Sequence, residues 1–358
     1  MSSKRLDGIV SGQIGYYVHH HGRGHLDRAR LIAGALQGRV TLIGTGISGT
    51  PFPELDLPDD RIDPSFAGED GESHRPDALH YAPLRHRGIT DRAAQMANWM
   101  AQARPSLMVV DVSVEVAMLA RLCAVPVLYV RLGGKRDDVA HRDAFRGASA
   151  LLAPFHELLD EDQIPAWIGA KTFYAPGLVN RAPRNSAATN LVLVILGKGG
   201  DGFSIDSIAQ AAIATSKWQW RVIGIGEPYG SPTLPANLEI AGWVENVDQE
   251  IARAGVVVGA GGDGVVGQVL AAGVPFICIP EDRPFDEQRS KAHMLKLRGA
   301  AIALDRWPPG EVWPALLDRA RKSDPSARHA LDDPAGIAKA AAFIGRLADR
   351  ARGRERAA

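Results

Sequence analysis

The chain has 358 residues, of which 46% are hydrophobic and 23% are charged, so it is long enough to form two domains with separate cores. Lys and Arg together number 41, as do Asp and Glu, and the formal net charge of zero excludes a global field that would gather nucleic acid or an anionic membrane. No run approaches the ~20 apolar residues of a membrane span, and the first apolar stretch is too short for a signal sequence, so we expect a cytoplasmic protein with at most peripheral membrane contact.

Short apolar runs alternate with helical patterns through the first half of the chain. Strands are indicated at residues 14–20, 40–44, 107–111 and 125–132, and helices at 26–37 and 115–124. Because the strands are apolar on both faces, they predict a parallel sheet covered by helices, which is a Rossmann-like α/β domain over residues 1–182. Residues 47–90 are rich in loop-forming residues and form either a flap over a binding site or an irregular connection.

The same alternation begins again after a stretch rich in Pro, Gly and Asn near residues 178–188. It predicts a second Rossmann-like domain over residues 183–335, followed by a C-terminal helix and basic tail at 336–358. Each such sheet presents its ligand-binding loops at the carboxyl ends of its strands. Two Rossmann-like domains are therefore expected to face a central cleft.

The first strand ends in a Gly-rich turn, HGRGH, that leads into a helix. Gly22 and Gly24 would let the backbone approach a ligand closely, and the helix N-terminus would offer free N–H groups to an anion. His25 would then face the cleft. The alternative is a histidine that only caps the helix.

Asp111 ends the strand at residues 107–111, at the same carboxyl edge of the sheet. A carboxylate beside an imidazole fixes its tautomer and stabilises its protonated form, as a general base requires. His25 and Asp111 are therefore our candidate catalytic dyad. Asp111 could instead cap the helix that follows it.

No metal site is expected. The three histidines at residues 19–21 lie on a predicted strand, where neighbouring side chains point to opposite faces and cannot converge on one ion. Cys123 and Cys278 lie in apolar segments without ligand-type neighbours, which is typical of buried thiols in a reducing compartment.

Two features of the second half point to a phosphate-bearing ligand. Gly199 and Gly200 follow a strand, where they could expose backbone N–H groups to a phosphate. The segment at residues 242–295 then shows, in order, an aromatic residue, a Gly-rich turn at 259–264, a helix, a Gly-Val-Pro step at 273–275, a strand and an Asp-x-Gln.

This order resembles the donor-binding signature of GT-B glycosyltransferases, particularly the family that includes the peptidoglycan enzyme adding N-acetylglucosamine to lipid I. HGRGH is likewise similar to the Gly-rich loop and histidine of the first domain of these enzymes. The resemblance assigns the following residues to the donor: Trp243 and Val244 to the nucleobase, Gly261, Gly262 and Gly264 to the diphosphate, and Asp286 and Gln288 to sugar hydroxyls. Gln268 stands where the family usually has a Glu that accepts from both ribose hydroxyls, so a deoxyribose donor stays open.

The resemblance implies an inverting, metal-independent transfer of a sugar from a nucleoside diphosphate sugar, with a UDP-sugar as the first candidate and no further cofactor. Arg131 and Arg136 lie in a cation-rich segment at residues 130–147, which favours a phosphorylated acceptor such as a cell-envelope intermediate. A small hydroxylated metabolite is the alternative acceptor.

Three other functions fit parts of the pattern. Gly259, Gly261 and Gly264 also satisfy the dinucleotide fingerprint, with Glu281 at the end of the next strand, so an NAD-dependent oxidoreductase is one alternative. A sugar-nucleotide 2-epimerase would use the same fold and cleft without an acceptor. A binding protein without catalysis would keep the donor contacts and lack the base.

Overall fold

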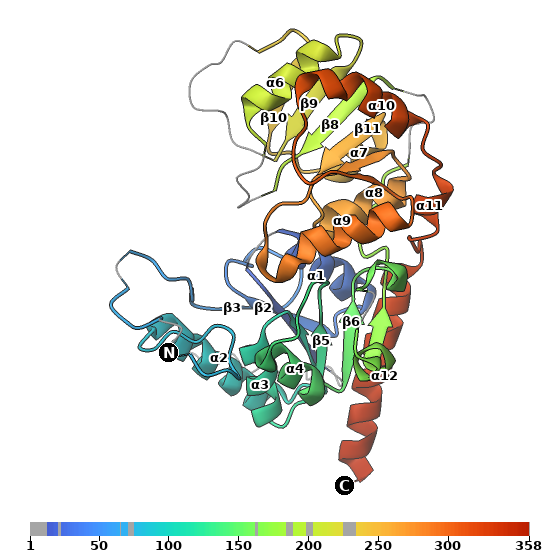
Figure 1. The fold of residues 1–358 in the computed structure, drawn as a ribbon. Coiled ribbons are helices and arrows are strands. Elements are labelled where there is room, and N and C mark those ends of the chain that lie inside the picture. Colours follow the sequence, from blue (N-terminus) through green and yellow to red (C-terminus); the bar gives the residue numbers. More distant parts are fainter. Residues whose placement is uncertain are drawn as a thin grey trace.

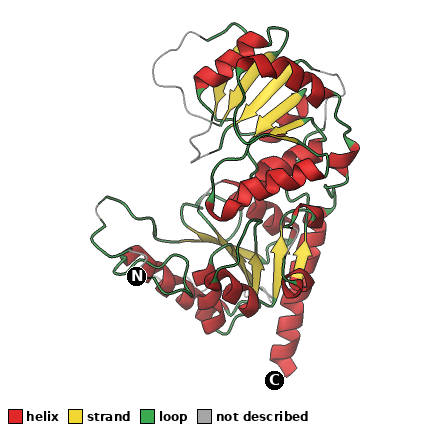
Figure 2. Ribbon diagram, viewed as in Figure 1, coloured by secondary structure: helices red, strands yellow, loops and turns green. Residues whose placement is uncertain are grey.

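The structure is a computed structural model that describes residues 13–20, 23–64, 66–70, 75–161, 164–183, 189–197, 203–224 and 234–357. Two α/β domains follow one another along the chain, each with one sheet flanked by helices (Figures 1 and 2). Among these residues no helix is long and apolar enough to cross a membrane.

The first domain contains a parallel sheet. Its strands are β1 (Ile14–Val18), β2 (Val40–Gly44), β3 (Glu54–Asp56), β4 (Leu107–Asp111), β5 (Val127–Val130), β6 (Ala150–Ala153) and β7 (Thr172–Tyr174). Its helices are α1 (Arg23–Ala35), α2 (Arg87–Ala103), α3 (Val114–Leu122), α4 (Val139–Gly147) and α5 (Ala166–Lys171), with a 3-10 turn at Glu157–Leu159. The strand order is β3-β2-β1-β4-β5-β6-β7, so the direction of winding reverses between β1 and β4.

The second domain repeats this topology. Its strands are β8 (Leu191–Ile195), β9 (Gln219–Ile223), β10 (Leu238–Gly242), β11 (Val256–Gly259), β12 (Phe276–Cys278) and β13 (Ile302–Ala303). Its helices are α6 (Ile205–Ala214), α7 (Val247–Arg253), α8 (Asp263–Ala272), α9 (Glu287–Leu297), α10 (Trp313–Arg321) and α11 (Ser326–His329), with 3-10 turns at Pro284–Asp286 and Gly310–Val312. The parallel order β10-β9-β8-β11-β12-β13 reverses between β8 and β11.

Burial explains why the apolar runs form these strands. Every residue of β1, β2, β4 and β5 is buried, as expected for a sheet covered on both faces. Each sheet has one apolar cluster on either face, so each domain is built around its own sheet. The prediction of two Rossmann-like α/β domains is therefore confirmed.

The C-terminal helix, α12 (Gly336–Ala357), returns to the first domain, beside β6 in Figure 1. Its buried residues belong to the first domain's core: Ala340, Ala341, Ile344 and Ala348. The ring of Phe343 stacks on Phe173 of β7 with centroids 4.3 Å apart. Residues 336–357, predicted as a separate terminal helix and tail, thus complete the first domain's core.

The two domains also share apolar packing. Phe155 and Leu159 of the first domain are buried in the same cluster as residues of α8 and α9. Arg181, in the segment that links the domains, forms an ion pair with Asp332 just before α12. The interface is therefore a packed contact, with α8 and α9 on the side of the second domain that faces α1 (Figure 1).

Candidate active site

His25 and Asp111 meet at the point where the first sheet reverses its winding. His25 lies in the first turn of α1, and Asp111 is the last residue of the neighbouring strand β4. Nδ1 of His25 is 3.1 Å from Oδ1 of Asp111. Val112, which follows, has a left-handed φ of 55°, an unfavourable conformation for a β-branched residue that turns the chain sharply away after Asp111.

Arg28 completes this cluster from the next turn of α1. Its Nη2 donates to both carboxylate oxygens of Asp111, at 2.8 and 2.7 Å, and lies 3.1 Å from Nδ1 of His25. Burial alone would raise the pKa of Asp111, but the charge of Arg28 and the hydrogen bonds from His25 and Arg28 hold it at about 2. Asp111 is therefore an ionised, fully buried carboxylate shared by two partners.

The capping alternative for Asp111 is wrong. The N-cap of α3 is Ser113, whose hydroxyl accepts from the backbone N–H of Val116 at 3.2 Å. Both carboxylate oxygens of Asp111 face Arg28 instead.

The second domain brings its Gly-rich turn to the same place. Gly262 occupies the N-cap position of α8 without a side-chain cap, so the first N–H groups of this helix receive no bond from that residue. A Cβ on Gly264 would lie 4.0 Å from Cα of Gly24, so the N-terminal turns of α8 and α1 approach each other across the interface. Such helix ends are suited to an anion.

Gln288 connects this turn to α9. Its Oε1 accepts from the backbone N–H of Gly261 at 3.2 Å and from that of Glu281 at 2.9 Å. A Cβ on Gly261 would lie only 2.7 Å from the backbone oxygen of Gln288, so glycine is required for this approach. Gln288 thus holds the turn in place through these two hydrogen bonds.

Buried charges lie beside the turn. Nζ of Lys291 is 2.9 Å from Oδ1 of Asp263 at the start of α8, and it also lies 3.5 Å from the ring centre of Phe155 in the first domain. Glu287 pairs with Arg136 of the first domain at 2.8 Å. Burial and the nearby Asp263 raise the pKa of Glu287, while the charges of Arg136 and Lys291 oppose the shift.

Comparisons with known proteins fit this geometry. Residues 226–307 match the model of the glycosyltransferase family 28 C-terminal domain. Among curated proteins, none matches the sequence. A crystal structure of MurG from Acinetobacter baumannii has the same fold, at 16% identity and a TM-score of 0.63, over 93% of this chain and 99% of that one.

Two further structures were solved with nucleotides. The spinosyn rhamnosyltransferase SpnG complexed with thymidine diphosphate matches at 16% identity and a TM-score of 0.57, over 94% of this chain and 96% of that one. LpCGTa in complex with UDP matches at 16% identity and a TM-score of 0.59, over 94% of each chain. The chain is a glycosyltransferase with the GT-B architecture.

Trp243 and Val244, expected to contact the nucleobase, follow β10 at the carboxyl edge of the second sheet. Trp243 is 53% exposed, and Val244 packs partly against the core. Gln268 is half-buried on α8. Gly22, Gly199 and Gly200 lie outside the described residues.

The two residues expected to contact the sugar, Asp286 and Gln288, lie in different surroundings. Gln288 is buried at the turn, whereas the carboxylate of Asp286 is half exposed and pairs with Lys135 of the first domain at 3.1 Å. The neighbouring Glu287, which the sequence pattern did not select, is the carboxylate that lies among the buried charges. Arg28, Asp263 and Lys291 were also missed, although Asp263 stands inside the recognised Gly-rich turn.

The expected acceptor-side cations require a correction. Arg131 is buried and forms an ion pair with Asp160, and its Nη2 also donates to the hydroxyl of Tyr174. Arg136 is paired with Glu287 at the interface. Both charges are already compensated within the protein, because Arg131 pairs inside the first domain and Arg136 pairs with a carboxylate of the second.

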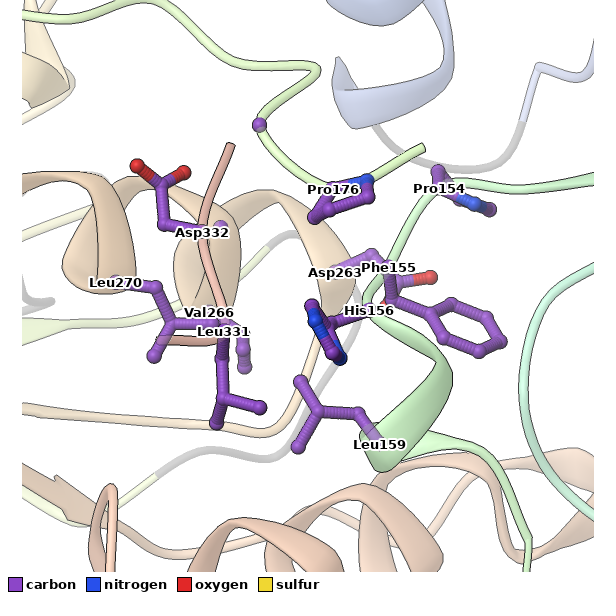
Figure 3. A pocket seen from close by; sticks show the side chains of 12 residues that line it. Pro154, Phe155, His156, Leu159, Pro176, Asp263, Val266, Leu270, Leu331 and Asp332 are labelled. Carbon is purple, nitrogen blue, oxygen red and sulfur yellow. The ribbon is translucent and has the colours of Figure 1, made fainter. Parts of the chain in front are cut away.

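A crevice between the domains lies beside Asp263 (Figure 3). Its lining is mostly apolar and includes Phe155 and Leu159 from one domain and Val266 and Leu270 from the other. With no Lys or Arg in the lining, it is unsuited to a diphosphate. Within the described ranges, no group of three or more His, Cys, Asp or Glu residues could hold a metal ion.

Proposed function

We propose that this glycosyltransferase moves a sugar from a nucleoside diphosphate sugar to an acceptor hydroxyl, with inversion at the anomeric carbon and without a metal ion. One observation carries the proposal. The His25–Asp111 pair of the first domain lies opposite the Gly-rich turn and helix N-terminus of the second domain.

The proposed catalytic step follows from the placement of the base in the first domain and the donor site in the second. We assign the Nδ1 proton of His25 to Asp111, because an ionised carboxylate is the strongest acceptor nearby. Nε2 is then free to take the proton of the acceptor hydroxyl. The resulting oxygen attacks the anomeric carbon while the bond to the diphosphate breaks, and the diphosphate leaves with the bonding electrons. Attack from the side opposite the leaving group inverts the configuration.

The donor is held by the second domain. The uncapped N-terminus of α8 and the turn around Gly261, Gly262 and Gly264 suit a diphosphate. Gln288, placed at this turn, is our sugar contact, and Trp243 with Val244 flanks the nucleobase. Since Gln268 replaces the usual acid, both UDP-sugars and TDP-sugars are candidates, and structural neighbours bound to each nucleotide support this range.

The acceptor is best matched by a small hydroxylated molecule. Arg131 and Arg136, two of the cations on which a phosphorylated cell-envelope acceptor was expected, are already paired within the protein. The free thiols Cys123 and Cys278 support a reducing, cytoplasmic location.

The test combines substitution with product stereochemistry. His25→Ala should lower turnover by about 10²- to 10⁴-fold, the usual loss for a general base, and leave donor affinity nearly unchanged. His293→Ala, at an exposed histidine of α9, is the matched control and should behave like wild type. NMR of the anomeric proton reports the configuration of the product.

Two outcomes contradict the proposal: retention at the anomeric carbon, or wild-type turnover in His25→Ala. Turnover of the nucleotide sugar alone, with epimerisation at C2 and no acceptor, would instead identify a 2-epimerase.

A further inference from the structure

The loop between β12 and α9 crosses the domain interface. At its tip, Phe285 and Asp286 both have left-handed backbone conformations, with φ of 65° and 53°. Non-glycine residues rarely adopt this conformation, and two in succession cost free energy that surrounding contacts must offset. The conformation of this loop therefore depends on what it touches.

The ring of Phe285 lies in an aromatic and cationic socket of the first domain, formed by His80, Arg136 and His141. The ring centre of His141 is 4.8 Å away and that of His80 is 5.4 Å away, both edge to face. The guanidinium of Arg136 lies over the ring at 4.5 Å. These are favourable geometries for aromatic and cation–π contacts.

The backbone of the loop is held by the same domain. The N–H of Lys135 donates to the carbonyl of Phe285 at 2.7 Å. Gly134 has a φ of +92°, and a Cβ there would lie 2.5 Å from this carbonyl, so only glycine permits the approach. The first domain is thus shaped to receive Phe285.

Phe285 lies three residues before Gln288, which contacts the Gly-rich turn. Glu287 pairs with Arg136, so one socket residue also fixes the start of α9. The next residue, Gln288, accepts from the N–H of Gly261. A continuous set of contacts therefore runs from the first domain through Phe285 and Gln288 to the turn of the second domain.

We infer that Phe285 is a positioning residue: its insertion into the His80–Arg136–His141 socket holds the loop in the conformation that places Gln288 against the Gly261 turn. Contact between the domains then completes the turn. The binding of the donor at this turn rests on the proposed function. The coupling between the Phe285 socket and the conformation of the turn does not.

The test is amide hydrogen exchange in the full chain without ligand, followed by mass spectrometry of peptides covering residues 259–264. Phe285→Ala should accelerate exchange there at least 10-fold, because Gly261 loses a well-placed acceptor. His80→Ala should act in the same direction although it lies in the other domain, which a role confined to the second domain would not produce.

The matched control is Trp167→Ala, since Trp167 of α5 also lies under an arginine, Arg146, at 5.5 Å, but this arginine is in the last turn of α4, at the opposite end from the socket. It should leave this exchange within twofold of wild type. Unchanged exchange in Phe285→Ala or in His80→Ala, or equal acceleration in Trp167→Ala, would overturn the inference. Because neither donor nor acceptor is present, the result is independent of the proposed activity.

Discussion

Arg28 changes how the histidine–carboxylate pair must be understood. A carboxylate buried with a neutral imidazole alone would be poorly compensated, and its pKa would rise. The guanidinium of Arg28 supplies the missing charge and two hydrogen bonds, so Asp111 stays ionised and can orient His25. This role was not predicted because arginine side chains usually face solvent, although the i, i+3 spacing on α1 places Arg28 on the same face as His25.

Removal of this arginine should separate stability from catalysis. Arg28→Met should lower the free energy of unfolding by about 3–5 kcal/mol, because it leaves Asp111 as a buried charge without its main partner. The double variant Arg28→Met/Asp111→Leu should recover part of that loss while turnover stays low, because His25 then lacks its carboxylate. Urea denaturation and turnover measure the two effects.

Arg23→Met is the control for this comparison, because Arg23 is exposed and pairs with an exposed carboxylate, Asp27, on the same helix. Its effect on stability should stay below about 1 kcal/mol. Equal destabilisation in the single and double variants would show that compensation of Asp111 is not the main role of Arg28.

At the scale of elements, α4 illustrates how a helix start can serve an interface. Asp138 caps the helix by accepting from the N–H of His141 at 3.0 Å and also lies 2.7 Å from its Nδ1. Nε2 of His141 is 3.2 Å from Nη1 of Arg136. Burial and the charge of Arg136 lower the pKa of His141 to about 4, although Asp138 opposes the shift. The neutral ring therefore donates to Asp138 and accepts from Arg136.

This arrangement predicts a pH-dependent loss of stability. The unfolded chain protonates this histidine near pH 6.5 and the folded chain only near pH 4, so protons favour unfolding. The contribution is fully present above pH 6.5 and is lost as the pH falls toward 4, by up to about 3 kcal/mol. His141→Gln should lack this dependence, and the difference in unfolding free energy between the two proteins should shrink from pH 7.5 to pH 5. Parallel curves for both proteins would contradict the assignment.

The elements themselves were largely predictable, because strands buried on both faces leave an unmistakable apolar run, as in residues 107–111 and 256–259. The position of α12 was not. Its apolar face shows that it packs against something, but the choice between two similar domains depends on tertiary complementarity with α1 and β7. The orientation of the Asp286 side chain was also not predicted, because it depends on the left-handed turn at Phe285 and not on the Asp-x-Gln spacing.

At the scale of the whole molecule, the two domains divide the proposed reaction between them. The first supplies His25 and Asp111, and the second supplies the Gly-rich turn and the N-terminus of α8. Helix α12 follows the second domain in the sequence but packs in the core of the first, so the chain crosses back over the domain boundary. The site therefore exists only in the assembled pair.

The N-terminus of α8 is expected to stabilise the leaving diphosphate. The N-terminus of α8 has no side-chain cap, and its dipole and free N–H groups can take up developing negative charge without a metal ion. Turnover should therefore survive excess EDTA within about twofold.

Gly262 has open space around the position of a Cβ, so Gly262→Asp can be accommodated. Its carboxylate would occupy the free N–H groups and repel the diphosphate, and nucleoside diphosphate affinity should fall about 10-fold or more by calorimetry, whereas the neutral Gly262→Ala should lose far less. If EDTA abolished turnover and Mg²⁺ or Mn²⁺ restored it, or if Gly262→Asp bound the diphosphate as tightly as wild type, the helix end would not be the group that stabilises the leaving diphosphate.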